Sequence, residues 1–140
     1  MMTTKIDPLR SAQMALIRGK DTRPELVVRH LVDDLRFKYK ANSNEAFGKP
    51  DLAFPRRKKA IFVHGCFWHQ HAKPSCWRSR LPKTRREFWL PKLEKNVIRD
   101  KRQLAKLRRM GWKALIIWEC ETIVSNRSRL RDRIQRFLRN

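Results

Sequence analysis

Residues 64–76 (HGCFWHQHAKPSC) contain three of the four histidines of the chain and two of its three cysteines. Cys66, His71 and Cys76 lie in this stretch, and Cys120 follows a run of apolar residues much later in the chain. Three thiolates and one imidazole form a complete tetrahedral ligand set for zinc, which sulfur ligands favour over magnesium. The pattern predicts a structural zinc site. The alternative is that Cys120 is simply buried and the loop thiols are free.

The charge of the chain points to a polyanionic partner. Lys and Arg number 35 against 13 acidic residues, a net charge of +22 over 140 residues. The positive charges of a compact fold repel one another unless a negatively charged partner neutralises them, and nucleic acid is the commonest such partner. The sequence has no apolar stretch long enough to span a membrane and no signal peptide. We expect a cytoplasmic protein of a bacterium-like cell, located at the nucleoid, with reduced thiols.

The hydrophobic pattern predicts one α/β domain. Residues 1–20 are basic and weakly patterned and are interpreted as an arm or short helix, and residues 21–140 as the domain. The elements expected in this domain are a helix at 21–35, short strands at 37–42, 50–54 and 58–65, a helix at 81–111, a strand at 112–120 and a helix at 128–140. This order predicts a small mixed central sheet flanked by helices.

The first of these helices has a recognisable start. Thr22 is a plausible N-cap, and Glu25 falls where a capping box places an acid. We expect the buried face to consist of Leu26, Val27, His30, Leu31 and Leu35.

Few acidic residues are available for catalysis, and Asp51 is the strongest candidate. It begins a strand that pairs with the strand leading into the histidine-rich loop, so its carboxylate could hold Mg²⁺. The alternative is a turn-starting aspartate. Glu25 is explained equally well as a capping residue, and Asp100 as an exposed helical ion pair.

His64 and His69 remain once zinc has its ligands. A neutral imidazole can take a proton from water near pH 7, which suits attack on a phosphodiester.

Aromatic residues accompany these candidates. Phe67 and Trp68 lie between the expected zinc ligands, and Trp89 lies in a very basic stretch. Aromatic rings beside basic residues can stack on bases or wedge between base pairs, and the alternative is core packing. For Phe88 and Trp118 we expect core packing.

Five motifs resemble the very-short-patch repair (Vsr) endonuclease family. In chain order they are RGKDTRPEL, GKPDLAF, IFVHGCFWHQH, FWLPKLEKNVIRD and GWKALIIWECE, and they cover roughly residues 10–121. The resemblance implies a restriction-endonuclease-like fold stabilised by zinc. It also implies Mg²⁺-dependent nicking of DNA on the 5′ side of the thymine in a T·G mismatch left by deamination of 5-methylcytosine. A polymerase and a ligase would then replace a short patch.

The resemblance also implies roles for matching residues around the magnesium ions. Asp51 and the backbone carbonyl of Val63 would hold the metal, and Glu25 would hydrogen-bond water held by it. A backbone ligand tolerates any side chain, so valine is acceptable at position 63.

The remaining roles concern proton transfer and DNA. The resemblance implies that His69 is the general base, with His64 and Asp100 in support. The strand AIFVHG lacks the second acid and the lysine of many restriction-type nucleases, and this family substitutes histidine. The residues implied to form a wedge in the major groove are Phe67, Trp68 and Trp89.

The basic segment 1–20 is implied to embrace the duplex from the other side. The spacing from His71 to the next cysteine is longer than is usual in the family, so Cys76 is the least secure zinc ligand.

The implied partners are duplex DNA with a T·G mismatch and, functionally, a cytosine-5 DNA methyltransferase, and the implied state is a monomer. Two alternatives remain: a Vsr-like nuclease of different specificity, and a zinc-stabilised DNA-binding module without catalysis. Asp51 and His69 argue against the second alternative, because a pure binding module needs neither.

Overall fold

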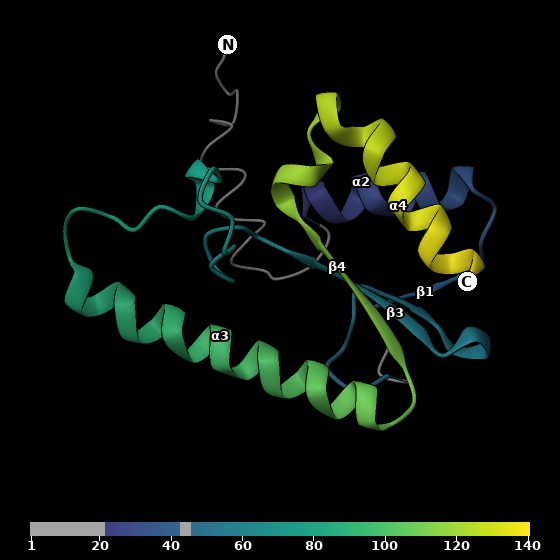
Figure 1. Ribbon diagram of the computed structural model, residues 1–140, viewed down its shortest axis with the longest axis horizontal. Coiled ribbons are helices and arrows are strands. Elements are labelled where there is room, and N and C mark those ends of the chain that lie inside the picture. The colour runs from purple at the N-terminus through teal and green to yellow at the C-terminus, as the bar shows by residue number, and fades with distance from the viewer. Residues whose placement is uncertain (1–21, 43–45) are drawn as a thin grey trace, which may run out of the picture.

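The computed structural model describes residues 22–42 and 46–140 (Figure 1), so the predicted basic segment 1–20 lies outside the described residues. The elements are α2 (Arg23–Asp34), β1 (Lys40–Ala41), β2 (Leu52–Phe54), β3 (Lys59–His64), α3 (Arg86–Arg109), β4 (Lys113–Trp118) and α4 (Arg127–Arg139). Their order confirms the predicted series, although each strand is shorter than expected. Within the described ranges, no helix is both long and apolar enough to cross a membrane.

The four strands form one mixed sheet in the order β1-β2-β3-β4. β1 pairs with β2 and β2 with β3 in antiparallel fashion, whereas β3 and β4 are parallel. In that parallel pair His64 lies opposite Trp118. Both strands therefore end at the same edge of the sheet, and the segments that follow them are neighbours.

Helices cover both faces of the sheet, with α3 on one side and α2 and α4 on the other (Figure 1). Alternate residues of β3 serve the two cores. Ile61 packs with α2 and α4, and Phe62 packs with Leu107 of α3. The predicted α/β architecture, a small mixed sheet flanked by helices, is confirmed.

The buried face predicted for the first helix is only partly correct: Leu31 and Leu35 are half-buried and pack against the core, whereas His30 is exposed. The Thr22 cap is confirmed, because its Oγ1 accepts a hydrogen bond of 3.4 Å from the backbone N–H of Glu25. The buried residues, however, are Glu25, Val28 and Val32, while Leu26 is 50% exposed. The helix is rotated so that an acidic side chain faces inward, and Val28 and Val32 follow on the same face at helical spacing.

The long helix ends as predicted but begins later. Gly111, with φ of +91°, follows the C-cap residue Met110 and takes a conformation that glycine tolerates best. The helix begins at Arg86 and not at residue 81, and Arg85 before it has a left-handed backbone.

A buried lysine joins β3 to the end of α4. Lys59 is 5% exposed, and its ammonium group donates to the carbonyl oxygens of Phe137 at 2.6 Å and Leu138 at 3.2 Å. Arg57 donates to the Leu138 carbonyl at 3.1 Å. These cations satisfy carbonyls that a helix C-terminus leaves without intrahelical partners.

We therefore expect Lys59→Met to lower the free energy of unfolding by about 1–3 kcal/mol, because buried carbonyls lose their donor. Urea unfolding followed by circular dichroism measures this loss. Lys101→Met, at an exposed position of α3, is the control and should unfold at the wild-type midpoint. Equal midpoints for the two variants would contradict the prediction.

Candidate active site and metal centre

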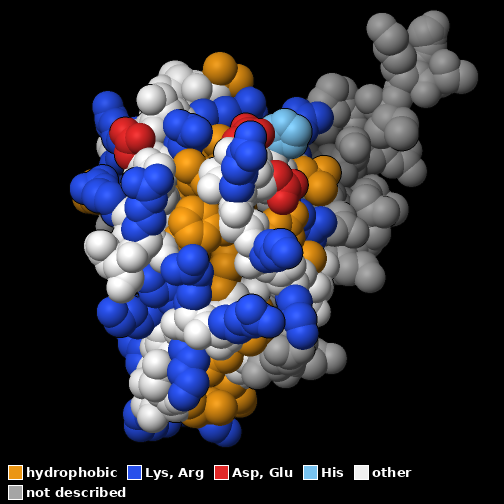
Figure 2. Space-filling model, turned by 90° about the vertical axis from the view of Figure 1, so that its right-hand side faces the viewer, with side chains coloured by type: hydrophobic (Ala, Val, Ile, Leu, Met, Phe, Trp, Pro, Cys, Tyr) orange, Lys and Arg blue, Asp and Glu red, His pale blue; other side chains and the backbone are white. Residues whose placement is uncertain are grey.

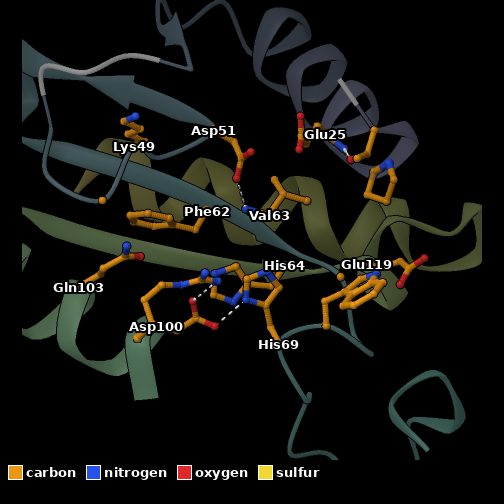
Figure 3. A pocket seen from close by; sticks show the side chains of 16 residues that line it. Glu25, Lys49, Asp51, Phe62, Val63, His64, His69, Asp100, Gln103 and Glu119 are labelled. Atoms are coloured by element: carbon orange, nitrogen blue, oxygen red, sulfur yellow. Dashed lines mark hydrogen bonds and ion pairs between the residues drawn. The ribbon is translucent and has the colours of Figure 1, made fainter. Parts of the chain in front are cut away.

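A pocket of about 310 Å³ lies between the start of α2, the end of β3 and the middle of α3 (Figure 3). Its lining includes all six residues predicted for nuclease chemistry, namely Glu25, Asp51, Val63, His64, His69 and Asp100. These residues come from four separate segments of the chain. The fold therefore brings together side chains that the sequence alone could only propose one at a time.

Two carboxylates face each other on one side of this pocket (Figure 3). Asp51 accepts a hydrogen bond of 2.6 Å from the backbone N–H of Val63, and Glu25 approaches it from α2. Burial and then the negative charge of Glu25 raise the pKa of Asp51 to about 8. One buried and one half-buried carboxylate with excess negative charge suit a hard divalent cation such as Mg²⁺.

Two histidines and an aspartate occupy the other side of the pocket. The rings of His64 and His69 stack with centroids 3.9 Å apart. His69 Nδ1 lies 2.5 Å from Asp100 Oδ2, so the carboxylate of α3 fixes the ring orientation. Burial, followed by the neighbouring His69, lowers the pKa of His64 to about 4, which keeps His64 neutral near pH 7. A carboxylate at Nδ1 favours the tautomer in which Nε2 is free to accept a proton.

The sequence did not identify the four further charged or amide side chains that line this pocket. They are Lys49, Arg99, Gln103 and Glu119. Glu119 accepts a hydrogen bond of 3.3 Å from the backbone N–H of Cys66, which links the ends of β4 and β3. The one available signal was its position directly after a buried strand, where an acid often marks a site at the carboxyl edge of parallel strands.

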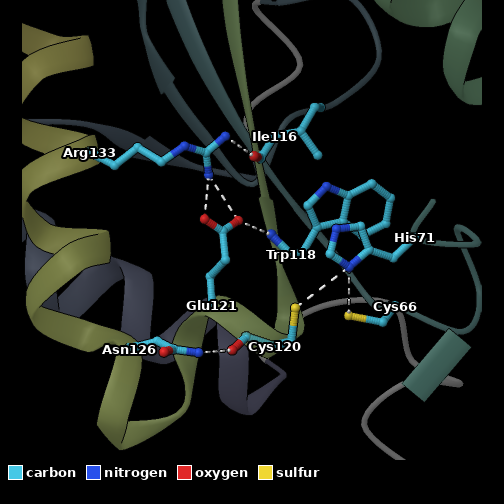
Figure 4. Close-up of polar contacts among 8 residues, drawn as sticks. All are labelled: Cys66, His71, Ile116, Trp118, Cys120, Glu121, Asn126 and Arg133. Carbon is cyan, nitrogen blue, oxygen red and sulfur yellow. Dashed lines mark hydrogen bonds and ion pairs between the residues drawn. The ribbon is translucent and has the colours of Figure 1, made fainter. Parts of the chain in front are cut away.

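The predicted zinc ligands form one cluster, and Figure 4 shows three of them, Cys66, His71 and Cys120. The ligand atoms of Cys66, His71, Cys76 and Cys120 all lie within 4.8 Å of one another. His71 Nδ1 is 3.7 Å from the sulfur of Cys66 and 3.5 Å from that of Cys120. Tetrahedral zinc with ordinary bond lengths would separate nitrogen and sulfur ligands by about 3.5 Å. The donor set and its spacing fit a metal ion, and Cys76 belongs to the set.

Hydrogen bonds from α4 and its preceding turn hold Cys120 in place (Figure 4). Arg133 donates to both carboxylate oxygens of Glu121, at 2.6 and 2.8 Å, and Glu121 accepts from the backbone N–H of Trp118 at 2.8 Å. Asn126 donates to the Cys120 carbonyl at 2.9 Å. The turn Glu119–Thr122, which carries the last predicted metal ligand, is thereby fixed on both sides of Cys120.

Three partly buried aromatic rings cluster on the loop after β3 and the first turn of α3. Phe67, Trp68 and Trp89 make mutual edge contacts, with centroids 5.3 to 5.7 Å apart. Asn96 of α3 donates to the Trp68 carbonyl at 3.1 Å, which fixes this loop against the helix. The expectation that Phe88 packs in the core is wrong. Its side chain is 46% exposed and contacts Trp89, whereas the buried side chains of α3 are Leu93 and Leu107.

Lys and Arg side chains spread over the surface, as the face in Figure 2 shows, with few acidic side chains among them. This distribution is consistent with the net charge of +22 and with a polyanionic partner.

Comparisons with known proteins agree with this geometry. Residues 4–75 match the family model described as DNA mismatch endonuclease Vsr. The Type II nicking enzyme V.XorIIP of Xanthomonas oryzae pv. oryzae is 38% identical over 98% of this chain and 98% of its own length. The DNA mismatch endonuclease Vsr of Escherichia coli is 39% identical over 79% of this chain and 69% of its own length.

A solved structure confirms the fold class. The catalytic domain of the homing endonuclease I-Bth0305I superposes with a TM-score of 0.57 at 23% identity, and the match covers 84% of this chain and 94% of that domain. The endonuclease fold, the family model and the relatives agree with the sequence resemblance. The chain belongs to the DNA mismatch endonuclease Vsr family and is an endonuclease.

Proposed function

We propose that this protein nicks duplex DNA at T·G mismatches that arise when 5-methylcytosine deaminates. It cuts the thymine-bearing strand on the 5′ side of that thymine, and the nick starts short-patch repair. The observation that carries this proposal is one pocket in which a carboxylate pair, Asp51 with Glu25, faces the His69–Asp100 pair. The aromatic cluster adjoins this pocket through Trp68, which lines it.

The carboxylate side of the pocket would hold magnesium. Asp51 and the Val63 carbonyl are the proposed ligands, and Glu25 orients water beside them. When bound, magnesium supplies positive charge that stabilises the scissile phosphate and the leaving oxygen. The backbone N–H of Val63 fixes the Asp51 carboxylate through the 2.6 Å hydrogen bond.

The histidine side of the pocket would move the proton. His69 accepts it from the attacking water, and Asp100 stabilises the imidazolium that results. His64 remains neutral and holds the His69 ring by stacking.

The aromatic cluster would recognise the damage. Phe67, Trp68 and Trp89 enter the major groove beside the mismatch and separate the stacked bases. A mismatch stacks poorly, so inserting rings there costs less free energy than in a matched duplex. This difference itself favours the mismatched substrate.

Further parts of the proposal concern the protein in its cell. Zinc at the four-residue cluster is structural, since no ligand position would remain open. The basic segment 1–20 contacts the duplex opposite the nuclease domain of residues 21–140. The protein acts as a monomer in the cytoplasm, at the nucleoid, alongside a cytosine-5 DNA methyltransferase that creates the modified base.

A nicking assay with Mg²⁺ tests the proposal. End-labelled duplexes carry T·G or C·G at one position in several flanking contexts. A cut in the thymine strand alone, directly 5′ of the mismatched thymine, is expected. Equal cutting of the matched duplex would instead establish a nuclease of different specificity. Binding without cutting in any context would establish a DNA-binding module.

Asp100→Asn is expected to lower the nicking rate at saturating DNA by about 10²-fold or more, because His69 loses the charge that stabilises its protonated form. Single-turnover kinetics measure the effect. Glu94→Gln, an exposed acid on the same helix, is the control and should nick at the wild-type rate. If His69 and Asp100 act as a unit, the double variant His69→Ala/Asp100→Asn is no slower than His69→Ala, and multiplicative losses would contradict the pairing.

A further inference from the structure

Helix α3 carries a continuous stripe of basic residues along one exposed side. The stripe consists of Lys92, Lys95, Arg99, Arg102, Lys106 and Arg109, all exposed. Steps of three and four residues alternate between them, which places all six on one face of the helix. At the helical rise the stripe is about 25 Å long.

The stripe borders a groove that is continuous with the active-site pocket. All its members except Lys92 line this groove, whose apolar floor includes Phe47, Ile98 and Ala105. Arg99 and Gln103 line both the groove and the pocket, so the two are adjoining parts of one surface. A surface with an apolar floor and cationic edges suits a sugar–phosphate backbone, whose sugars are less polar than its phosphates.

The charges of the stripe are largely uncompensated. Arg99 approaches Asp100 at 3.8 Å, but its side chain is 56% exposed, so the pair is weak. Lys106 lies over the Phe47 ring at 4.3 Å. Within residues 22–42 and 46–140, no acidic side chain forms an ion pair with Lys95, Arg102 or Lys106. Like charges at this spacing destabilise a helix. The stripe is therefore not explained by helix stability, and binding of a polyanion explains it better.

The two ends of the stripe define a direction. Lys92 lies 5.7 Å from the Trp68 ring and so begins the stripe at the aromatic cluster. Lys106 follows about 21 Å further along the helix, a distance of about six base pairs of duplex. The far end of the stripe therefore lies well beyond the position of a base pair opened by the aromatic cluster.

We infer that this stripe binds the phosphate backbone of one duplex arm, beginning at the mismatch and extending about six base pairs beyond it. The inference rests on the proposed action on DNA and adds a direction to it: one flank of the mismatch is held by α3 and the other is not. Affinity then depends on the length of one arm only, through contacts that carry no sequence information.

The test compares two variants of equal charge. Lys106→Gln/Arg109→Gln removes the far end of the stripe, whereas Lys101→Gln/Arg108→Gln removes one lysine and one arginine from exposed positions of α3 that do not line the groove. Fluorescence anisotropy without Mg²⁺ measures binding of T·G duplexes over a range of salt concentrations. Each arm is set in turn to about 5 or about 12 base pairs, so that the short arm ends before Lys106.

For the wild type, lengthening one particular arm should tighten binding and steepen the salt dependence. The stripe variant should lose about 2 units of that slope on the long-arm duplex and bind the short-arm duplex as the wild type does. The control should resemble the wild type on both duplexes. Equal losses in both variants, or a loss independent of arm length, would overturn the inference. Failure of the proposed function appears separately, as wild-type protein that neither prefers nor nicks the T·G duplex.

Discussion

Replacing Asp51 with asparagine is expected to reduce nicking by at least about 10³-fold while leaving mismatch binding intact. The carboxylate is the proposed side-chain ligand of magnesium, fixed by the backbone N–H of Val63, and the neutral amide removes the charge that holds the cation. Gel-based nicking assays and anisotropy measure the two effects. Asp132→Asn, an exposed aspartate of α4, is the control. Loss of binding and cutting together would show instead that Asp51 supports the fold of the site.

The same substitution is expected to stabilise the protein in the absence of magnesium. Burial and Glu25 raise the pKa of Asp51 from 3.8 to about 8, so the folded state binds this proton more tightly than the unfolded state. The free energy of unfolding of the wild type therefore falls as pH rises from about 4 to about 8. Asp51→Asn has no titrating group at this position and should not show this fall.

We expect the variant to unfold at a Tm higher by several degrees at pH 8 and by less at pH 5, for a gain of about 1–3 kcal/mol. Added Mg²⁺ should raise the Tm of the wild type and not that of the variant. A variant less stable than the wild type at pH 8 would contradict the repulsion between the two carboxylates.

Loss of a cluster ligand is expected to have the largest effect on folding. Cys120→Ser and His71→Gln should reduce bound zinc well below about one ion per chain and leave the protein largely unfolded at 37 °C. Structural zinc contributes about 10–16 kcal/mol in small domains, comparable with or above the whole stability of a typical domain.

Metal analysis and calorimetry of the purified proteins test this expectation. His30→Gln changes the one histidine outside the site and the cluster, on the exposed side of α2, and should keep full zinc and the wild-type Tm. Cys120→Ser protein with a full complement of zinc and an unchanged Tm would show that Cys120 is only a buried thiol.

The metal cluster and the order of elements could be predicted because most of the signal for each lies in short stretches of sequence. Soft ligands crowd one short loop, and the apolar periodicity changes from helix to strand at identifiable residues. The buried face of α2 could not be predicted this way. Glu25 is buried and lines the pocket. The hydrophobic pattern alone would bury apolar Leu26 and expose the acid.

The missed pocket residues have a different cause. Lys49, Gln103 and Glu119 join the site only through the strand register and the position of α3, which depend on contacts distant in sequence. Phe88 was misplaced because aromatic character alone does not show which face of α3 packs inward, and that face carries Leu93 and Leu107.

The parallel register of β3 and β4 links the predicted metal cluster to the proposed active-site pocket. It places Trp118 beside His64, with ring centroids 5.2 Å apart, and also stacks Trp118 on His71 at 4.2 Å. The Trp118 indole therefore contacts one residue of the proposed active-site pocket and one residue of the predicted metal cluster. If the cluster holds zinc as proposed, loss of the metal should also disturb the proposed active-site pocket, because Trp118 contacts residues of both. We therefore expect nicking activity to be lost together with the bound metal when the protein is heated.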